Sequence, residues 1–198
     1  MKRSHAESLL YVALETEKGG LKLYETALRA ARNPGLREEW QGYLEETQTH
    51  HDKLVAILKG LELDPGKSVP AQAVVRHKGQ SLVKAIQLAM DTLSAEEAEL
   101  VAAECVVEAE SKDHLNWSLL EHLADEGPKD FAKAIREAVD EILPQEAHHR
   151  FHTEGYAREL WLKHLGLPAA LPPPEEEKSV ETKIGAGRAE KARQDYVS

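Results

Sequence analysis

Residues 131–160 read FAKAIREAVDEILPQEAHHRFHTEGYAREL, and one side of this stretch recurs at intervals of three and four residues. That interval is the period of an α-helix. The recurring positions are Phe131, Ile135, Ala138, Ile142, Glu146, His149, Thr153, Tyr156 and Leu160. The stretch therefore predicts a long helix, from about Lys129 to Leu165, whose apolar stripe carries an acid and an imidazole at its middle. Pro144 lies inside it, and a proline within a helix removes a backbone hydrogen bond, so we expect a kink there.

The same period predicts three further long helices and a short one. The long helices extend from about Ser4 to Ala31, from Leu36 to Leu61 and from Ala95 to Ala124, and the short one from Gln80 to Leu93. Ser4 and Ser94 are the expected N-caps, because each is followed three residues later by a glutamate that completes a capping box.

The connections between these helices are unequal in length. Short loops join the first long helix to the second and the third to the fourth, so each pair is expected to be antiparallel. Residues 62–93 form a long crossover between the two pairs. The prediction is an all-α four-helix bundle of two antiparallel hairpins, joined by a crossover with a short extra helix, which is the ferritin-like arrangement.

Composition supports a helical protein and excludes several classes. The 198 residues include 41% hydrophobic and only 5% aromatic side chains, too few aromatics for a typical β-sandwich. With 25 basic and 35 acidic residues the net charge is −10, so nucleic acid is not an expected partner. The sequence lacks a run of 18 apolar residues, so no membrane association is expected.

The compartment and the domain division follow from local composition. Glu7 and Glu15 interrupt any apolar leader, and the single cysteine cannot form an internal disulfide, so a cytoplasmic location is expected. Residues 1–167 are expected to form the bundle. Residues 168–198 begin with a proline-rich and acidic linker and continue as a polar tail. That tail is either disordered or an arm that docks onto a partner.

Each predicted helix carries a polar residue where its stripe should be apolar. Glu17 falls between Leu14 and Leu21, His50 lies in the second stripe, and Glu110 lies in the third. A carboxylate in a bundle core is costly unless it is paired, protonated or bound to a metal. Asp113, one turn after Glu110, could add a carboxylate. Two further acids, Glu104 and Glu108, are the alternative donors if the helical phase differs.

These residues lie midway along their helices, so antiparallel packing should bring them to one level. The predicted metal ligands are Glu17, Glu46, His50, Glu110, Glu146 and His149. Four carboxylates and two imidazoles are the donors of a dinuclear iron or manganese site, and zinc could replace either metal. For any single residue the alternative is a solvated helix face. His51, His148 and His152 are expected at the surface, where His148 and His152 could form an adventitious metal clip.

Two motifs resemble the ferritin-like superfamily. They are Glu17-x6-Tyr24 and Glu146-x-x-His149. Residues 43–50, YLEETQTH, are similar to the Leu-Glu-Glu-Thr-x-x-His segment of the YciE/YciF-type stress-protein family. That pattern departs from the superfamily at Thr47, where the second helix usually has a glutamate.

The resemblance implies roles for these residues. Glu46 and Glu146 would bridge two metals, His50 and His149 would each hold one, and Glu17 and Glu110 would be terminal ligands. Tyr24 would donate a hydrogen bond beside the cofactor. If Glu46 cannot reach the site, one metal is held differently.

The resemblance implies a stress-associated oxidoreductase of peroxidase or ferroxidase type. It would reduce peroxide or O2, or oxidise Fe(II), and would take electrons from an external donor. The alternatives are a non-catalytic metal-binding or scaffold bundle that docks a partner through its tail, and a bundle with a structural metal or none. A homodimer is expected from the apolar run Leu160, Trp161 and Leu162.

Overall fold

The computed structural model describes residues 2–170, and in that part of the chain the regular structure consists of five helices without a strand. The helices are α1 (Arg3–Ala30), α2 (Pro34–Gly60), α3 (Pro70–Thr92), α4 (Ala95–Glu126) and α5 (Lys129–His164). The predicted all-α class is therefore confirmed as a helical bundle. Most of the predicted linker and tail, residues 171–198, lies outside the described residues.

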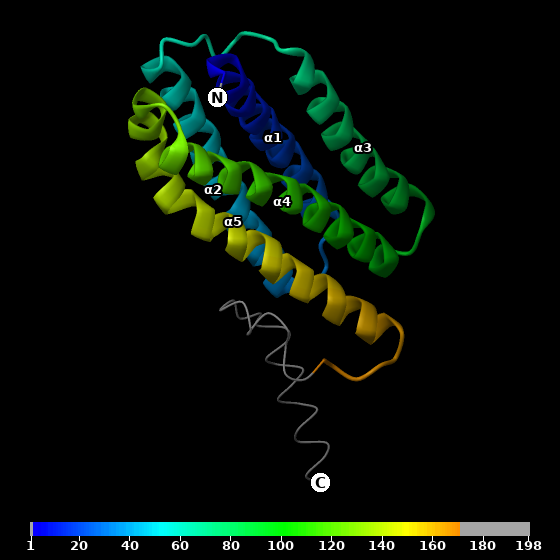
Figure 1. The fold of residues 1–198 in the computed structure, drawn as a ribbon. Helices are drawn as coiled ribbons and strands as arrows, with labels where there is room; N and C mark the ends of the chain where they lie inside the picture. Colours follow the sequence, from blue (N-terminus) through cyan, green and yellow to red (C-terminus); the bar gives the residue numbers. More distant parts are fainter. Residues whose placement is uncertain (1, 171–198) are drawn as a thin grey trace.

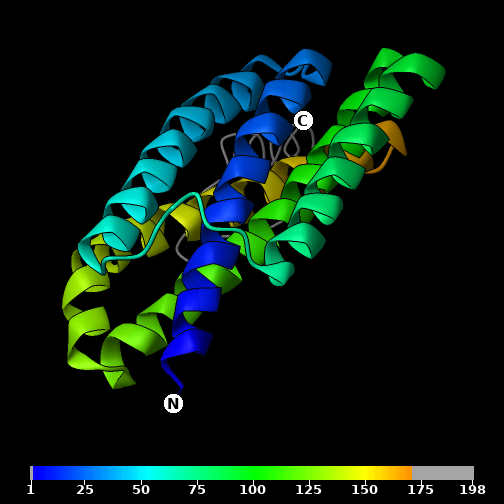
Figure 2. The ribbon, with the colours of Figure 1, turned by 90° about the horizontal axis from the view of Figure 1, so that it is seen from above.

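Two antiparallel hairpins form the body of the bundle, as Figure 1 shows for α1 with α2 and for α4 with α5. Helix α1 also packs on α4, and α2 packs on α5, which closes a four-helix arrangement. The connection from α2 to α4 includes α3 and runs along the length of the bundle (Figures 1 and 2). This connection makes α2 and α4 parallel.

The crossover helix α3 is longer than the sequence pattern predicts. It begins at Pro70 rather than Gln80 and packs against both α1 and α4. Proline is compatible with the first turn of a helix, where its missing N–H would have no intrahelical partner. The side chain of Gln72 accepts a hydrogen bond from the Val69 N–H at 2.9 Å, which further secures this start. A fifth helix thus covers one side of the bundle.

Of the two predicted N-caps, the one on α4 is confirmed and the one on α1 is wrong. Ser94 caps α4, and Glu97 completes the capping box. Ser4 is not a cap, because α1 already begins at Arg3 and Lys2 occupies the cap position without a side-chain hydrogen bond. The cap of α2 is Asn33, whose side chain accepts from the Leu36 N–H at 3.1 Å.

Helix α5 continues through Pro144 without a break. Its ribbon changes direction in the first half of the helix (Figures 1 and 2). Pro144 cannot donate a hydrogen bond to the carbonyl four residues earlier, and a bend at unbroken helical geometry is the usual response.

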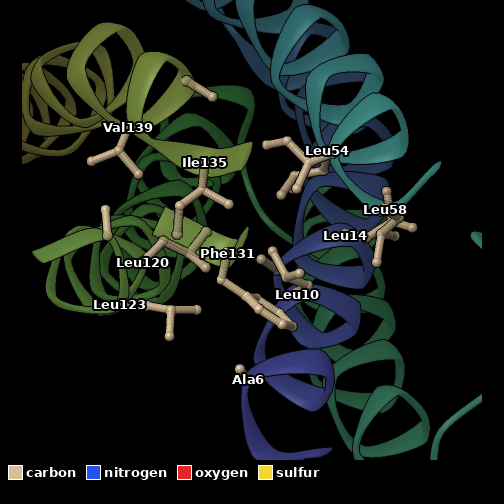
Figure 3. Packing of buried hydrophobic residues seen from close by; sticks show 14 of the residues in the cluster. Ala6, Leu10, Leu14, Leu54, Leu58, Leu120, Leu123, Phe131, Ile135 and Val139 are labelled. Carbon is tan, nitrogen blue, oxygen red and sulfur yellow. The ribbon is translucent and has the colours of Figure 1, made fainter. Parts of the chain in front are cut away.

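The apolar core consists of two clusters, one toward each end of the bundle. One cluster contains Leu10, Leu14, Leu54, Leu58, Trp117 and Phe131 among its members, and Figure 3 shows its leucines and Phe131 pointing toward one another. The other contains Leu23, Leu36, Trp40, Ile86, Leu100 and Tyr156. Each of α1, α2, α4 and α5 contributes to both clusters, so each crosses the level between them.

The apolar run Leu160, Trp161 and Leu162, from which the homodimer is predicted, partly packs against other residues of the same chain. Leu160 is buried, and Trp161 packs against the second cluster while its Nε1 donates to Glu104 at 2.8 Å. The homodimer stays a prediction.

Candidate metal centre

A layer of buried polar side chains separates the two apolar clusters. It contains Glu17 from α1, His50 from α2, Glu110 and Asp113 from α4, and Glu146 and His149 from α5. None of these six residues is more than 5% exposed. The helical period placed all of them on inward faces, because each falls where its stripe passes from one cluster to the other. Five of them belong to the predicted ligand set, and Asp113 is the additional carboxylate.

One half of the layer is formed by Glu17, His50 and Glu146. The Nδ1 atom of His50 lies 2.9 Å from Oε1 of Glu146 and 3.8 Å from Oε1 of Glu17. Each residue offers one ligand atom, and these atoms all lie within 4.8 Å of one another. One carboxylate from each hairpin and one imidazole thus meet at a spacing that a single cation could bridge.

The other half is formed by Glu110, His149 and the same Glu146. The Nδ1 atom of His149 lies 3.6 Å from Oε2 of Glu110 and 3.8 Å from Oε1 of Glu146. The ligand atoms of this group also lie within 4.8 Å of one another. The rings of His50 and His149 are nearly parallel, with centroids 5.8 Å apart. Two adjacent three-residue groups therefore share one carboxylate.

In four of these side chains, one polar atom makes a hydrogen bond to a residue outside the layer, and the other polar atom lacks a hydrogen-bond partner. Trp117 Nε1 donates to Oε1 of Glu17 at 2.9 Å, and Tyr24 donates to Oε1 of Glu110 at 2.7 Å. The Nε2 atom of His50 lies 2.9 Å from Gln145, and that of His149 lies 2.5 Å from Glu46. The opposite atoms are buried and form no hydrogen bond within the described residues, although the two Nδ1 atoms lie close to carboxylate oxygens: Glu17 Oε2, Glu110 Oε2, His50 Nδ1 and His149 Nδ1.

Asp113 Oδ1 and Glu146 Oε2 are also buried without a hydrogen-bond partner in the described chain. A buried polar atom left unpaired costs about 1–3 kcal/mol, and more when the group is charged. Because the unpaired atoms belong to side chains of one layer, a cation placed there would satisfy several of them together. The donor set thus fits bound metal on the chain's own geometry.

Without a cation, the layer favours protons on its carboxylates. Burial, followed by the negative charge of neighbouring acids, raises the pKa of Glu17 and of Glu146 well above its usual range. Burial and the charge of Glu110 raise the pKa of Asp113 to about 8. Ligation requires deprotonated carboxylates, so a metal ion binding here would release protons.

The two imidazoles differ in their protonation. Burial lowers the pKa of His50 to about 4, so its ring is neutral and able to bind a metal. Burial also lowers the pKa of His149, but contacts with Glu110 and Glu46 outweigh it and raise the value to about 9. A cation at Nδ1 of His149 would therefore replace a proton.

Glu46 lies outside both groups. Its side chain is 43% exposed and contacts the outer Nε2 atom of His149 rather than the inward-facing Nδ1. The neighbouring Thr47 takes the inward position and is buried. The predicted bridging role of Glu46 therefore does not match its placement. A residue one position off the stripe points away from the centre of the layer.

The other candidate residues are also placed. Glu104 and Glu108 are exposed, whereas Glu110 faces inward. The helical phase predicted for α4 is therefore confirmed, and the alternative donors lie on the surface. Of the histidines expected at the surface, His148 is exposed, His51 is partly buried and His152 is buried. His152 lies against Glu39 of α2, a contact that the sequence pattern does not indicate.

A cavity lies beside the layer, between α3 and the pair α1 and α4. It is mostly apolar, and its lining includes Thr16, Gly20 and Lys112. Thr16 precedes Glu17 in the chain, and Lys112 precedes Asp113, so the cavity borders the segments that carry two of the buried acids. The longer α3 forms its outer wall, which is why the sequence pattern did not reveal it.

Comparison with protein-family models, with curated proteins and with solved structures finds no match. Among the helices of residues 2–170, none has the length and apolar character needed to cross a membrane. The candidate centre therefore stands on its own geometry.

Proposed function

We propose that this chain is a ferritin-like dinuclear metal protein that holds two iron or manganese ions in its buried layer. The supporting observation is that each of four side chains makes a hydrogen bond through one polar atom while its other polar atom is buried without one. The four buried carboxylates of the layer would balance the charge of two divalent cations. Carboxylate-rich sites with some imidazole suit iron and manganese, and zinc can substitute.

Each ion would have its own donors. Glu17 and His50 would hold one, and Glu110 and His149 the other. Glu146 belongs to both groups, so it would bridge the two ions. Asp113 lies near enough to influence the protonation of Glu17 and Glu146, and it would supply the fourth carboxylate.

The ferritin-like part of the proposal is supported by connectivity. Two antiparallel hairpins joined by a crossover along the bundle are the layout in which inward carboxylates and Glu-x-x-His motifs build such sites. The proposed biological role is that of a stress-associated oxidoreductase, for which the segment YLEETQTH supplies the resemblance.

When bound, two iron or manganese ions would supply redox chemistry in which O2 or peroxide is reduced by two electrons that come from an external donor or from Fe(II) as the substrate that is oxidised. The chain would exclude bulk water from this chemistry, because the six residues of the layer are buried. Tyr24 would orient Glu110 through its hydroxyl. The half-exposed Glu46 would hold the Nε2 atom of His149 and so orient the ring that ligates the metal through Nδ1.

The test is metal content together with turnover. Untagged protein grown with ample iron and manganese should contain about two equivalents per chain by elemental analysis, and anomalous scattering at the two metal edges should locate them in the layer. Glu146→Gln should lose at least one equivalent, while the exposed Glu108→Gln should keep both. Less than a few tenths of an equivalent in the wild type would refute the proposal. The redox role additionally requires turnover of peroxide, O2 or Fe(II).

A non-catalytic metal-binding or scaffold bundle is the second candidate function. It is favoured by the nearly complete burial of all six layer residues, which restricts access by substrates. Two equivalents of metal without turnover of peroxide, O2 or Fe(II) would support it over the enzyme. Its predicted docking arm lies in residues outside the described range.

A further inference from the structure

A second cluster of metal-ligating side chains lies outside the buried layer, between α2 and α5. It consists of Glu39, His148 and His152, whose ligand atoms lie within 4.8 Å of one another. It shares no residue with the two groups of the layer. His152 is buried, Glu39 is partly buried and His148 is exposed, so the cluster extends from the bundle to the surface.

The two histidines are four residues apart on α5, so their side chains lie on the same face of the helix. Their ring centroids are 3.8 Å apart. The Nδ1 atom of His152 lies 2.7 Å from Oε2 of Glu39, which brings the carboxylate of α2 onto this pair. Three donors from two helices therefore converge on one point.

The carboxylate of Glu39 is fixed by two tyrosine hydroxyls. Tyr43 donates to its Oε2 at 2.8 Å, and Tyr156 donates to its Oε1 at 3.3 Å. Such outer hydrogen bonds orient metal ligands and strengthen binding. Glu39 is thus positioned by the fold, unlike a mobile surface acid.

The ring of Tyr43 also lies next to the buried layer. Its centroid is 4.1 Å from that of His149 and 5.9 Å from that of His148. One aromatic side chain therefore contacts a residue of each site. The two sites are close neighbours with separate ligands.

We propose that Glu39, His148 and His152 form a third, mononuclear site for a divalent transition-metal ion. Two imidazoles and one carboxylate suit Zn²⁺, Co²⁺ or Cu²⁺, whereas Mg²⁺ and Ca²⁺ prefer sites built from oxygen alone. Three protein donors leave positions open, and the exposure of His148 places them toward solvent. This inference is independent of the proposed function, because it uses none of the ligands of the buried layer.

The site can be tested by titrating Co²⁺ into the untagged full-length protein after metal removal, with visible absorption and elemental analysis as readouts. The double variant His148→Gln with His152→Gln should bind one equivalent less than the wild type. The control variant His51→Gln should bind as the wild type does, because His51 pairs with Asp52 at 2.9 Å and belongs to neither site. Far-UV circular dichroism should show that all variants are folded.

The two metal proposals are separated by the reverse experiment. Glu146→Gln should lose metal from the layer and still bind the outer equivalent. If the wild-type layer holds no metal, the wild type and Glu146→Gln should both bind the outer equivalent alone. Tyr156→Phe should weaken the outer equivalent about tenfold or more and leave the others unchanged. Millimolar Mg²⁺ should not displace the outer Co²⁺. Equal stoichiometry in the wild type and the double histidine variant would overturn the inference.

Discussion

The Nε2 atom of His149 lies 2.5 Å from Oε2 of Glu46, and this contact turns the Nδ1 atom of the ring toward Glu110 and Glu146. Glu46 is the half-exposed partner and His149 is the buried one. A carboxylate that holds the outer nitrogen of a histidine fixes the tautomer and the orientation of the ring. The acid that the sequence suggested as a bridging ligand is therefore placed to support a ligand.

Glu46→Gln should weaken metal binding without changing its stoichiometry. Outer-shell partners of ligating histidines contribute about 10–100-fold in affinity, so the loss should fall in that range. Isothermal titration of metal-free protein with Mn²⁺ would measure it. Glu45→Gln is the matched control, because Glu45 is exposed and adjacent in sequence. Loss of a whole equivalent in Glu46→Gln would instead make Glu46 a direct ligand.

The stability of the metal-free protein should fall as the pH rises from about 6.5 to 8. The folded-state pKa values of Glu17, Asp113 and Glu146 are raised by burial, so the folded chain binds more protons than the unfolded chain in this window. His149, with its pKa raised to about 9, acts in the same direction. His50 has its pKa lowered to about 4 and acts in the opposite direction only below about 6.5.

Thermal unfolding of metal-free and metal-loaded protein at several pH values would measure this dependence. The loaded protein should not show the decline, since the cations take the place of the protons. If the melting temperature of the metal-free form instead rises between pH 6.5 and 8, the buried carboxylates do not control the pH dependence of stability.

Tyr24→Phe should destabilise the metal-free protein by about 1–3 kcal/mol, the usual cost of leaving a buried acceptor unpaired. The hydroxyl of Tyr24 donates to Oε1 of Glu110 at 2.7 Å, and both residues are buried. Urea unfolding would measure the change. Tyr11→Phe is a useful comparison, because its hydroxyl donates to the backbone carbonyl of Asp64 at 2.9 Å, away from the layer. Only Tyr24→Phe should also reduce metal affinity.

Leu58→Ala should cost about 2–5 kcal/mol of stability through loss of apolar contacts and the cavity left behind. Leu58 is fully buried in the first apolar cluster, away from the polar layer. Chemical denaturation would measure the loss. The variant should bind the same number of metal ions as the wild type. A change in metal stoichiometry would show that the layer depends on the packing of the adjacent cluster.

The helical period was sufficient to predict most of the layer. The direction of a side chain along a helix is fixed by 3.6 residues per turn, so Glu17, His50 and Glu110 could be placed inward from the sequence alone. Glu46 could not be placed as reliably. It lies one position off the stripe, and its partner depends on how α2 is rotated against α5.

Other features depend on packing between distant segments. The contact between Glu39 and His152 joins residues 113 positions apart, and nothing in either local pattern indicates it. The predicted start of α3 at Gln80 was ten residues too late, because the helix begins at Pro70 and a proline is compatible with the first turn of a helix. The sequence contained the spacing of Glu39 and Tyr43, one helical turn apart, which could have suggested a shared role.

The division of the core into two clusters has a consequence for local opening. Isolated helices fray from their ends, but apolar packing secures both ends of α1, α2, α4 and α5, so we expect the polar middle of these four helices to be their least stable section in the metal-free form. Within these helices, amide hydrogen exchange should accordingly be faster around residues 14–20 and 145–150 than in the apolar sections on either side, and it should slow there first on metal addition. Such a molecule would open locally at the polar layer between the two apolar clusters while both clusters stay packed.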